Sequence, residues 1–130
     1  MSAYRLYADA AGRTHIAPLA LLDRPWENGP GDFKGVGGSV LGDASRVMLM
    51  RFETGARPSF HRAAPGFLVL LEGELVVNAS DGDEVVLAPG DAVRVETTGQ
   101  GGWRLGNRAA GYALAAIAQM PPTARPSGSD

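Results

Sequence analysis

The chain has 130 residues, of which 45% are hydrophobic and 20% are charged, and its formal net charge at pH 7 is −2. A chain of this length forms one domain, and the absence of cysteine excludes disulfides, thiolate nucleophiles and cysteine-type zinc sites, as in cytoplasmic proteins. The basic residues are scattered and no apolar stretch approaches a signal sequence or the about 20 residues of a membrane span, so we expect neither nucleic acid nor membrane as a partner.

The N-terminal part, residues 1–45, is predicted to hold two short strands and a long connection. The strands are expected at residues 4–7 and 14–17, with a glycine-containing turn between them, and His15 lies in the second. Residues 23–42 are too rich in glycine and proline for a helix, so we expect a connection with a short strand near residues 38–41. Trp26 is expected to pack this connection against the rest of the domain, with a place at a pocket mouth as the alternative.

Regular alternation begins at Arg46 and predicts a strand with two different faces. One face is mixed and carries Val47, Leu49, Arg51 and Glu53, whereas the other is apolar and carries Met48, Met50 and Phe52. Further strands are predicted at residues 75–79, 84–88, 92–96, 103–105 and 112–119, and Ser80-Asp81-Gly82-Asp83 is typical of a hairpin turn. Many short strands at even spacing indicate a sandwich or a small barrel.

Three residues in this strand-rich region keep a distinctive spacing: Gly55, His61 after five intervening residues, and Gly73. The stretch resembles the first conserved motif of the cupin family, in which a glycine is followed by His-x-His, a glutamate and a second glycine. Residues 82–107 loosely fit the second motif of that family through Gly82, Pro89-Gly90-Asp91 and Asn107. The resemblance covers residues 46–119 and implies an all-β, cupin-type double-stranded β-helix, or jelly-roll, barrel. It also implies a strand at residues 112–119, where the alanine content alone would favour helix.

The same resemblance divides the chain into three parts. Residues 1–45 would pack on the barrel, residues 46–119 would form it, and residues 120–130, rich in proline, serine and glycine, would be a disordered tail.

The metal chemistry of the family is mostly missing from this sequence. Cupins normally hold a metal with three histidines and a carboxylate, which suit Mn, Fe, Ni or Zn. Here Ala63 stands at the second histidine, Gly66 or Phe67 at the glutamate, and Gly102 or Trp103 at the third histidine. His61 alone cannot hold a divalent ion firmly, so we predict no metal and no cofactor. The alternative is a rebuilt site that joins His61 and His15, with Glu53, Glu74, Asp91 and Glu96 as further candidate ligands; otherwise His15 bonds backbone at a sheet edge and Asp91 caps its own turn.

The resemblance places His61 inside the barrel, where it would act as a general acid and base. Alternation would bring Ser59 and Ala63 to the same side, and the small residues leave room for an organic ligand. The predicted pocket lining comprises Ser59, Ala63, Gly66, Leu68, Leu70 and Trp103. Arg51 is the predicted catalytic partner that would clamp a carboxylate or enolate, and its alternative is an edge arginine in a salt bridge. For His61 the alternative is a hydrogen-bonded core residue.

These features favour a small-molecule-binding cupin that works as a metal-independent lyase, isomerase or cyclase. The alternatives are a non-catalytic ligand-binding or sensor module, or a structural dimer with a filled barrel. A homodimer is expected in either case, because the apolar Val-Leu-Leu and Met-Leu-Met stretches exceed what one domain of this length needs.

Overall fold

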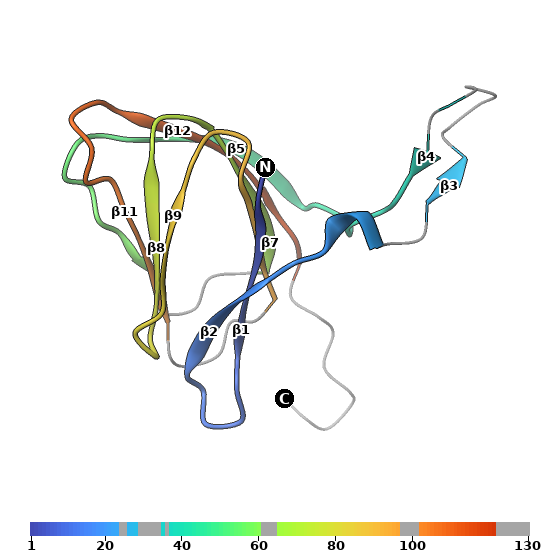
Figure 1. Ribbon diagram of the computed structural model, residues 1–130, viewed down its shortest axis with the longest axis horizontal. Coiled ribbons are helices and arrows are strands. Elements are labelled where there is room, and N and C mark those ends of the chain that lie inside the picture. Colours follow the sequence, from blue (N-terminus) through green and yellow to red (C-terminus); the bar gives the residue numbers. More distant parts are fainter. Residues whose placement is uncertain (24–25, 29–34, 36, 61–64, 97–101, 122–130) are drawn as a thin grey trace.

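The computed structural model describes residues 1–23, 26–28, 35, 37–60, 65–96 and 102–121 (Figure 1). Within these residues almost every regular element is a strand. The strands are β1 (Ala3–Ala8), β2 (Thr14–Pro18), β3 (Glu27–Asn28), β4 (Gly37–Gly38), β5 (Arg46–Phe52), β6 (Ser59–Phe60), β7 (Gly66–Glu72), β8 (Leu75–Ala79), β9 (Glu84–Leu87), β10 (Ala92–Val95), β11 (Trp103–Gly106) and β12 (Ala113–Gln119), with a 3-10 helix at Leu21–Asp23. None of the described helical residues belongs to a segment long and apolar enough to cross a membrane.

The strands form two main sheets. The larger sheet has the order β2-β1-β10-β7-β12-β5 and the smaller has the order β6-β11-β8-β9, while β3 and β4 pair separately (Figure 1). All of the pairings in the two main sheets are antiparallel except that of β1 with β10. Apart from the hairpins β1-β2 and β8-β9, neighbouring strands in this order are not consecutive in the chain, which is the arrangement of a jelly roll. The predicted all-β barrel is therefore confirmed.

A single apolar core lies between the two sheets. In β7 the buried residues Gly66, Leu68 and Leu70 alternate with less buried ones, as the period of a strand requires. The core as a whole comprises Leu6, Phe52, Leu68, Leu70, Leu75, Val77, Ala79, Leu87, Val93, Val95, Leu105, Ala113 and Ala115. These side chains come from both sheets, and they fill the described part of the barrel interior with hydrocarbon.

The two glycines that frame the first motif have a backbone conformation that other residues adopt with strain. Gly55 has a φ of 84° and Gly73 a φ of 85°, both in the left-handed region. A Cβ on Gly73 would also lie 2.6 Å from the carbonyl oxygen of Tyr112, so this turn leaves no room for a side chain. The glycine spacing of the motif thus follows from the turns it makes.

Strand β5 settles which of its two faces points inward. Phe52 is buried, whereas Val47 and Leu49 are 73% and 69% exposed. The apolar face therefore packs on the core and the mixed face lies outside. The expectation that Arg51 and Glu53 could point inward is wrong. Only one face of β5 can pack on the core, and burial of the apolar face stabilises the folded state more than burial of the mixed face.

The outer face of the larger sheet is unusually apolar. We call the outer apolar face the set of residues Val47, Leu49, Phe67, Val69, Leu71, Leu114, Ala116 and Ala118, which lie on three adjacent strands. Ala116 of β12 pairs with Leu49 of β5 on one side and with Val69 of β7 on the other. Contiguous exposed apolar residues of this kind are typical of interaction surfaces.

Other expectations meet the structure as follows. The strands expected at residues 4–7 and 14–17 are present as β1 and β2, and residues 113–119 form a strand rather than a helix. The short strand in the glycine-rich connection lies at residues 37–38, slightly earlier than expected. Trp26 is 54% exposed. The tail beyond residue 121 lies outside the described residues.

Candidate functional site

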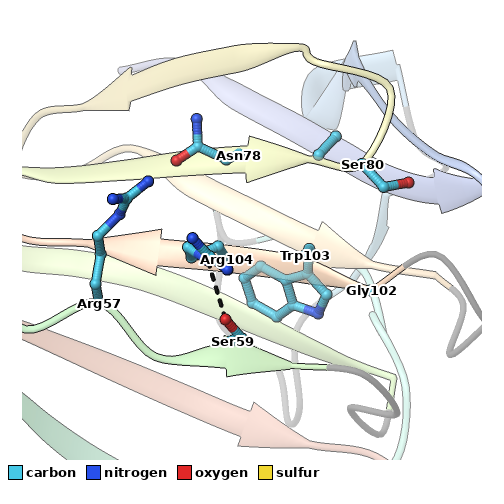
Figure 2. Close-up of a pocket in the computed structure, with 8 residues that line it drawn as sticks. Arg57, Ser59, Asn78, Ser80, Gly102, Trp103 and Arg104 are labelled. Carbon is cyan, nitrogen blue, oxygen red and sulfur yellow. Dashed lines mark hydrogen bonds between the residues drawn. The ribbon is translucent and has the colours of Figure 1, made fainter.

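An open pocket of about 360 Å³ lies against the smaller sheet (Figure 2). It is lined by Arg57, Ser59, Asn78, Ala79, Ser80, Gly102, Trp103 and Arg104. The pairing of the strands brings these residues together, because Arg104 of β11 pairs with Ser59 of β6 on one side and with Asn78 of β8 on the other. Three segments that are distant in the chain therefore build one site.

The polar side chains of this pocket belong to the outer surface of the sheet. Val77 and Ala79 in β8 and Leu105 in β11 belong to the core. Because successive residues of a strand point to opposite faces, their neighbours Asn78 and Arg104 point away from the core. The polar side chains of the pocket thus lie outside the core, whereas Ala79 and Trp103, which also line the pocket, contact it.

Two arginines lie along this pocket, and each is positioned by a neighbour. The Nε of Arg104 donates a hydrogen bond to the Oγ of Ser59 at 2.9 Å (Figure 2). The stem of Arg57 passes over Gly106, where an added Cβ would lie 3.2 Å from the Cγ of Arg57. The absence of a side chain at Gly106 therefore leaves room for the stem of Arg57. The hydroxyl of Ser59 orients the guanidinium plane of Arg104.

An acidic residue lies near the pocket, but it already has partners. The Nδ2 of Asn78 donates to Glu84 Oε1 at 3.0 Å, and Arg108 Nη1 lies 3.4 Å from the same oxygen. The hydrogen bond from Asn78, followed by the charge of Arg108 and lastly by that of Arg57, lowers the pKa of Glu84. Glu84 is thus a charged carboxylate at neutral pH, and its contacts leave the Oδ1 of Asn78 as an acceptor beside the pocket.

The other end of the pocket is fixed by Thr14 of β2, which is only 2% exposed. The backbone nitrogen of Ser80 donates to Thr14 Oγ1 at 2.7 Å, and Thr14 Oγ1 lies 2.7 Å from the carbonyl oxygen of Gly102, to which it can donate. Both Ser80 and Gly102 line the pocket. The N-terminal hairpin therefore shapes the site from the outside.

His15 follows Thr14 in β2 and lies between the turns that contain Asp9 and Asp81. Its Nδ1 lies 2.6 Å from Asp81 Oδ2 and its Nε2 lies 2.7 Å from Asp9 Oδ2, and the ring stacks on Tyr7. The hydrogen bond to Asp9, and after it that to Asp81, raises the pKa of His15. The expectation that His15 bonds the backbone is wrong, because both of its ring nitrogens are hydrogen-bonded to carboxylates from neighbouring turns. The potential ligand atoms of His15, Asp81 and Asp83 lie within 4.8 Å of one another, but both ring nitrogens are already engaged.

Comparison with known proteins identifies the fold family. No family model matches the chain, and no curated protein matches it significantly. Among solved structures, a sugar phosphate isomerase from a cupin superfamily of Silicibacter pomeroyi has a TM-score of 0.51 and 27% identity, over 58% of this chain and 49% of that one. The chain has the cupin fold.

Two other solved structures match the chain. A structural-genomics protein of unknown function from Rhizobium leguminosarum gives a TM-score of 0.50 and 27% identity, covering 58% of this chain and 68% of that one. A cupin domain from Bordetella pertussis has a TM-score of 0.47 and 19% identity, covering 64% of this chain and 90% of that one. The match spans about half the length of the Silicibacter cupin.

The described residues do not fit the metal centre that is typical of cupins. At Gly66, a Cβ would lie 2.6 Å from the carbonyl oxygen of Ala118, so the backbone contact leaves no space for a glutamate. Phe67, the alternative position, alternates with the buried residues of β7 and faces outward. Gly102 and Trp103 offer no imidazole or carboxylate. The donor set in the described part of the chain therefore differs from three histidines and a carboxylate.

The other candidate ligands have roles of their own. Asp91 is buried and accepts hydrogen bonds from the backbone nitrogens of Ala88 at 2.9 Å and Ser2 at 2.7 Å, so it caps its turn. Glu96 pairs with Arg5 and Arg94 on the larger sheet. Glu53 and Glu74 are exposed. None of these carboxylates lines the pocket.

Several of the predicted site residues lie away from the pocket. Leu68 and Leu70 are 2% and 0% exposed and belong to the core. Arg51 lies on the outside of the edge strand β5, with its Nε 2.9 Å from Glu53 and its guanidinium 4.5 Å from the ring centroid of Tyr112. Arg51 is thus the edge arginine of the alternative interpretation. Its distance from the pocket follows from the inward direction of the apolar face of β5.

Ser59 and Trp103 do line the pocket, though in a different arrangement from the one expected. Phe60 packs against the core and stacks on Trp103 at 4.7 Å, so the adjacent Ser59 faces outward. His61 and Ala63 lie outside the described residues.

Sequence reasoning missed four polar residues of the pocket: Arg57, Asn78, Ser80 and Arg104. Alternation within β8 and β11 could have assigned Asn78 and Arg104 to one face. The local pattern holds no signal that β6, β11 and β8 are neighbours.

Proposed function

We propose that the protein is a small-molecule-binding cupin whose ligand site is the pocket against β6, β11 and β8. The observation that carries this proposal is the gathering of five hydrogen-bonding side chains, Arg57, Ser59, Asn78, Ser80 and Arg104, around about 360 Å³ of open space. This volume falls in the range of roughly 300 to 1,000 Å³ that is usual for small-molecule sites. The core between the two sheets, by contrast, is made of apolar side chains in the described residues.

Two tryptophans make this site easy to observe, because Trp103 lines the pocket and Trp26 does not. In a ¹H–¹⁵N NMR titration with sugars, sugar phosphates, keto acids and enols, a ligand of the pocket should shift the indole signal of Trp103 and leave that of Trp26 in place. Asn78→Ala should weaken the binding, whereas Val86→Ala, on the exposed face of β9, should not. Binding that shifts only Trp26, or that is equally weakened by both variants, would refute the pocket as the site.

The catalytic form of this proposal is a metal-independent isomerase, lyase or cyclase in which His61 moves a proton. Two facts support it. The Silicibacter cupin with 27% identity is a sugar phosphate isomerase, and His61 directly follows β6, which carries Ser59. An imidazole that titrates near neutral pH can donate and accept protons without a metal.

The variant His61→Ala tests this catalytic role. Turnover should fall roughly 10²-fold or more, the usual contribution of a positioned general base. The free energy of unfolding should change by only about 1 kcal/mol. A stability loss of about 1 to 3 kcal/mol with unaltered function is the behaviour of a core histidine and would end the catalytic form of the proposal.

A non-catalytic binding or sensor cupin is the second candidate. It is supported by the polar lining of the pocket, which binds a ligand without requiring a reaction. Ligand binding at Trp103 that survives His61→Ala unchanged, without turnover of any bound compound by the wild type, would favour this candidate.

A further inference from the structure

We infer that the pocket recognises an oxyanion, the phosphate or carboxylate of its ligand, through Arg57 and Arg104. This inference rests on the proposed binding function and names the chemical class of the ligand. It comes from the charge state of the pocket, the orientation of its donors and the pairing of arginines elsewhere in the molecule.

The arginines of this protein differ in how their charges are balanced. Four of them have a carboxylate within hydrogen-bonding or ion-pairing distance: Arg5 and Arg94 pair with Glu96, Arg51 pairs with Glu53, and Arg108 pairs with Glu84. Within the part of the chain that the structure describes, Arg57 and Arg104 have no carboxylate within 4.0 Å, and the same is true of Arg13 and Arg46, which do not line the pocket. Arg57 and Arg104 do line it. A guanidinium stays charged at any physiological pH, so the pocket carries two positive charges without a direct counter-ion.

Glu84 interacts with the charge of Arg57, but its own charge is shared with other groups. Glu84 is bound by Asn78 and by Arg108, so its negative charge is already shared. The whole chain has a net charge of −2. The positive pocket is therefore a local arrangement rather than a consequence of a basic protein.

The guanidinium of Arg104 is held in a way that suits an oxyanion. Its Nε donates to Ser59, which fixes the plane of the group and leaves the two terminal nitrogens as donors. A planar pair of N–H donors matches the two oxygens of a carboxylate or phosphate. Arg57, placed by its contact with Gly106, adds a second charge at the same end of the pocket (Figure 2).

The rest of the lining is neutral and polar. Asn78 presents its Oδ1, and Ser80 lies toward the other end of the pocket from Arg57 (Figure 2). Hydroxyl and amide groups of this kind bind the hydroxyls of a small polyol. The ligand that fits best is thus a small hydroxylated molecule with one anionic group.

The test compares glucose, glucose 6-phosphate and gluconate, with inorganic phosphate as a competitor, in NMR titrations that follow the Trp103 indole. Wild-type protein should bind at least one of the two anions about tenfold or more tightly than glucose, since a hydrogen bond to a charged group contributes about 1.5 to 3 kcal/mol, a factor of ten or more. A preference for glucose 6-phosphate identifies a phosphate site, and a preference for gluconate identifies a carboxylate site.

The variants Arg57→Gln and Arg104→Gln should each weaken binding of the anion much more than binding of glucose, and so remove most of this preference. Arg46→Gln is the matched control, because it makes the same change of charge at the start of β5, away from the pocket. Thermal melting verifies that each variant is folded. Equal loss of anion binding in Arg46→Gln would show general electrostatic attraction and overturn the inference.

Two negative outcomes are distinguishable. If glucose shifts the Trp103 signal but the anions bind no better, the oxyanion inference fails and the binding function stands. If no compound of either kind shifts the Trp103 signal, both fail.

Discussion

Asn107 provides a direct test of what holds this fold together. Its side chain is 1% exposed. The Nδ2 donates to the carbonyl oxygens of Phe52 at 2.9 Å and Gly111 at 2.8 Å, and the Oδ1 accepts from the backbone nitrogen of Ala109 at 3.0 Å. One amide therefore holds the end of β5 and the turn before β12 together.

Replacement by Asn107→Leu removes all three hydrogen bonds at a similar side-chain volume. Each bond contributes about 1 kcal/mol net, and a buried carbonyl left without a partner costs about 1 to 3 kcal/mol. Burial of the leucine methyls offsets part of this loss. We expect the free energy of unfolding to fall by about 2 to 4 kcal/mol, a large share of the roughly 5 to 15 kcal/mol of a typical domain.

The measurement is urea unfolding followed by circular dichroism and tryptophan fluorescence, with an unchanged slope against denaturant as the sign of a change in stability alone. Asn78→Leu is the matched control, because Asn78 is less buried and makes one side-chain bond to the exposed Glu84. It should cost at most about 1 kcal/mol. A loss below about 1 kcal/mol for Asn107→Leu, or equal losses in both variants, would refute the reasoning.

Three further predictions concern pH, assembly and metal. The hydrogen bond to Asp9, and after it that to Asp81, raises the pKa of His15 in the folded protein. The contribution of His15 to the stability of the folded protein should therefore be complete below about pH 6.5, the pKa of an unfolded histidine. It should be lost as the pH rises through the pKa of the folded state. His15→Gln should abolish this step in an unfolding series over about pH 5 to 9, and an unaltered step would contradict the assignment. On the proposal that a second copy covers the outer apolar face, light scattering should give about twice the chain mass of 13.5 kDa. Leu49→Lys should shift the protein to the monomer, and a wild type already at the monomer mass would exclude the dimer. Protein purified without chelator should contain well under one transition metal per chain by elemental analysis, a prediction that near-stoichiometric metal surviving dialysis would contradict.

The sequence by itself determined the local elements of this protein. The alternation from Arg46 predicted β5 because a strand has a period of two residues, and the Ser80–Asp83 turn predicted the hairpin of β8 and β9 because its residues favour a tight reversal. Residues 113–119 are the exception. Their alanines favour helix, and they form a strand because β12 lies between β7 and β5.

Tertiary structure decided which face of each strand is inside. Both faces of β5 carry apolar residues, so the pattern alone could not assign Val47 and Leu49 to the surface. They are exposed because only one face of the strand can pack on the core, and the face of Phe52 does so. The same holds for Ser59. Its outward direction follows from the packing of Phe60 against the core.

Tertiary structure also decided the site. Asp9 is close to His15 in the chain, but Asp81 reaches it from another hairpin. Ser59, Asn78 and Arg104 meet because β11 pairs with β6 and β8. Turn chemistry and side-chain period act over a few residues, so they can be read locally. The order of strands in a sheet is set by contacts between distant segments, and the pocket exists only once that order has formed.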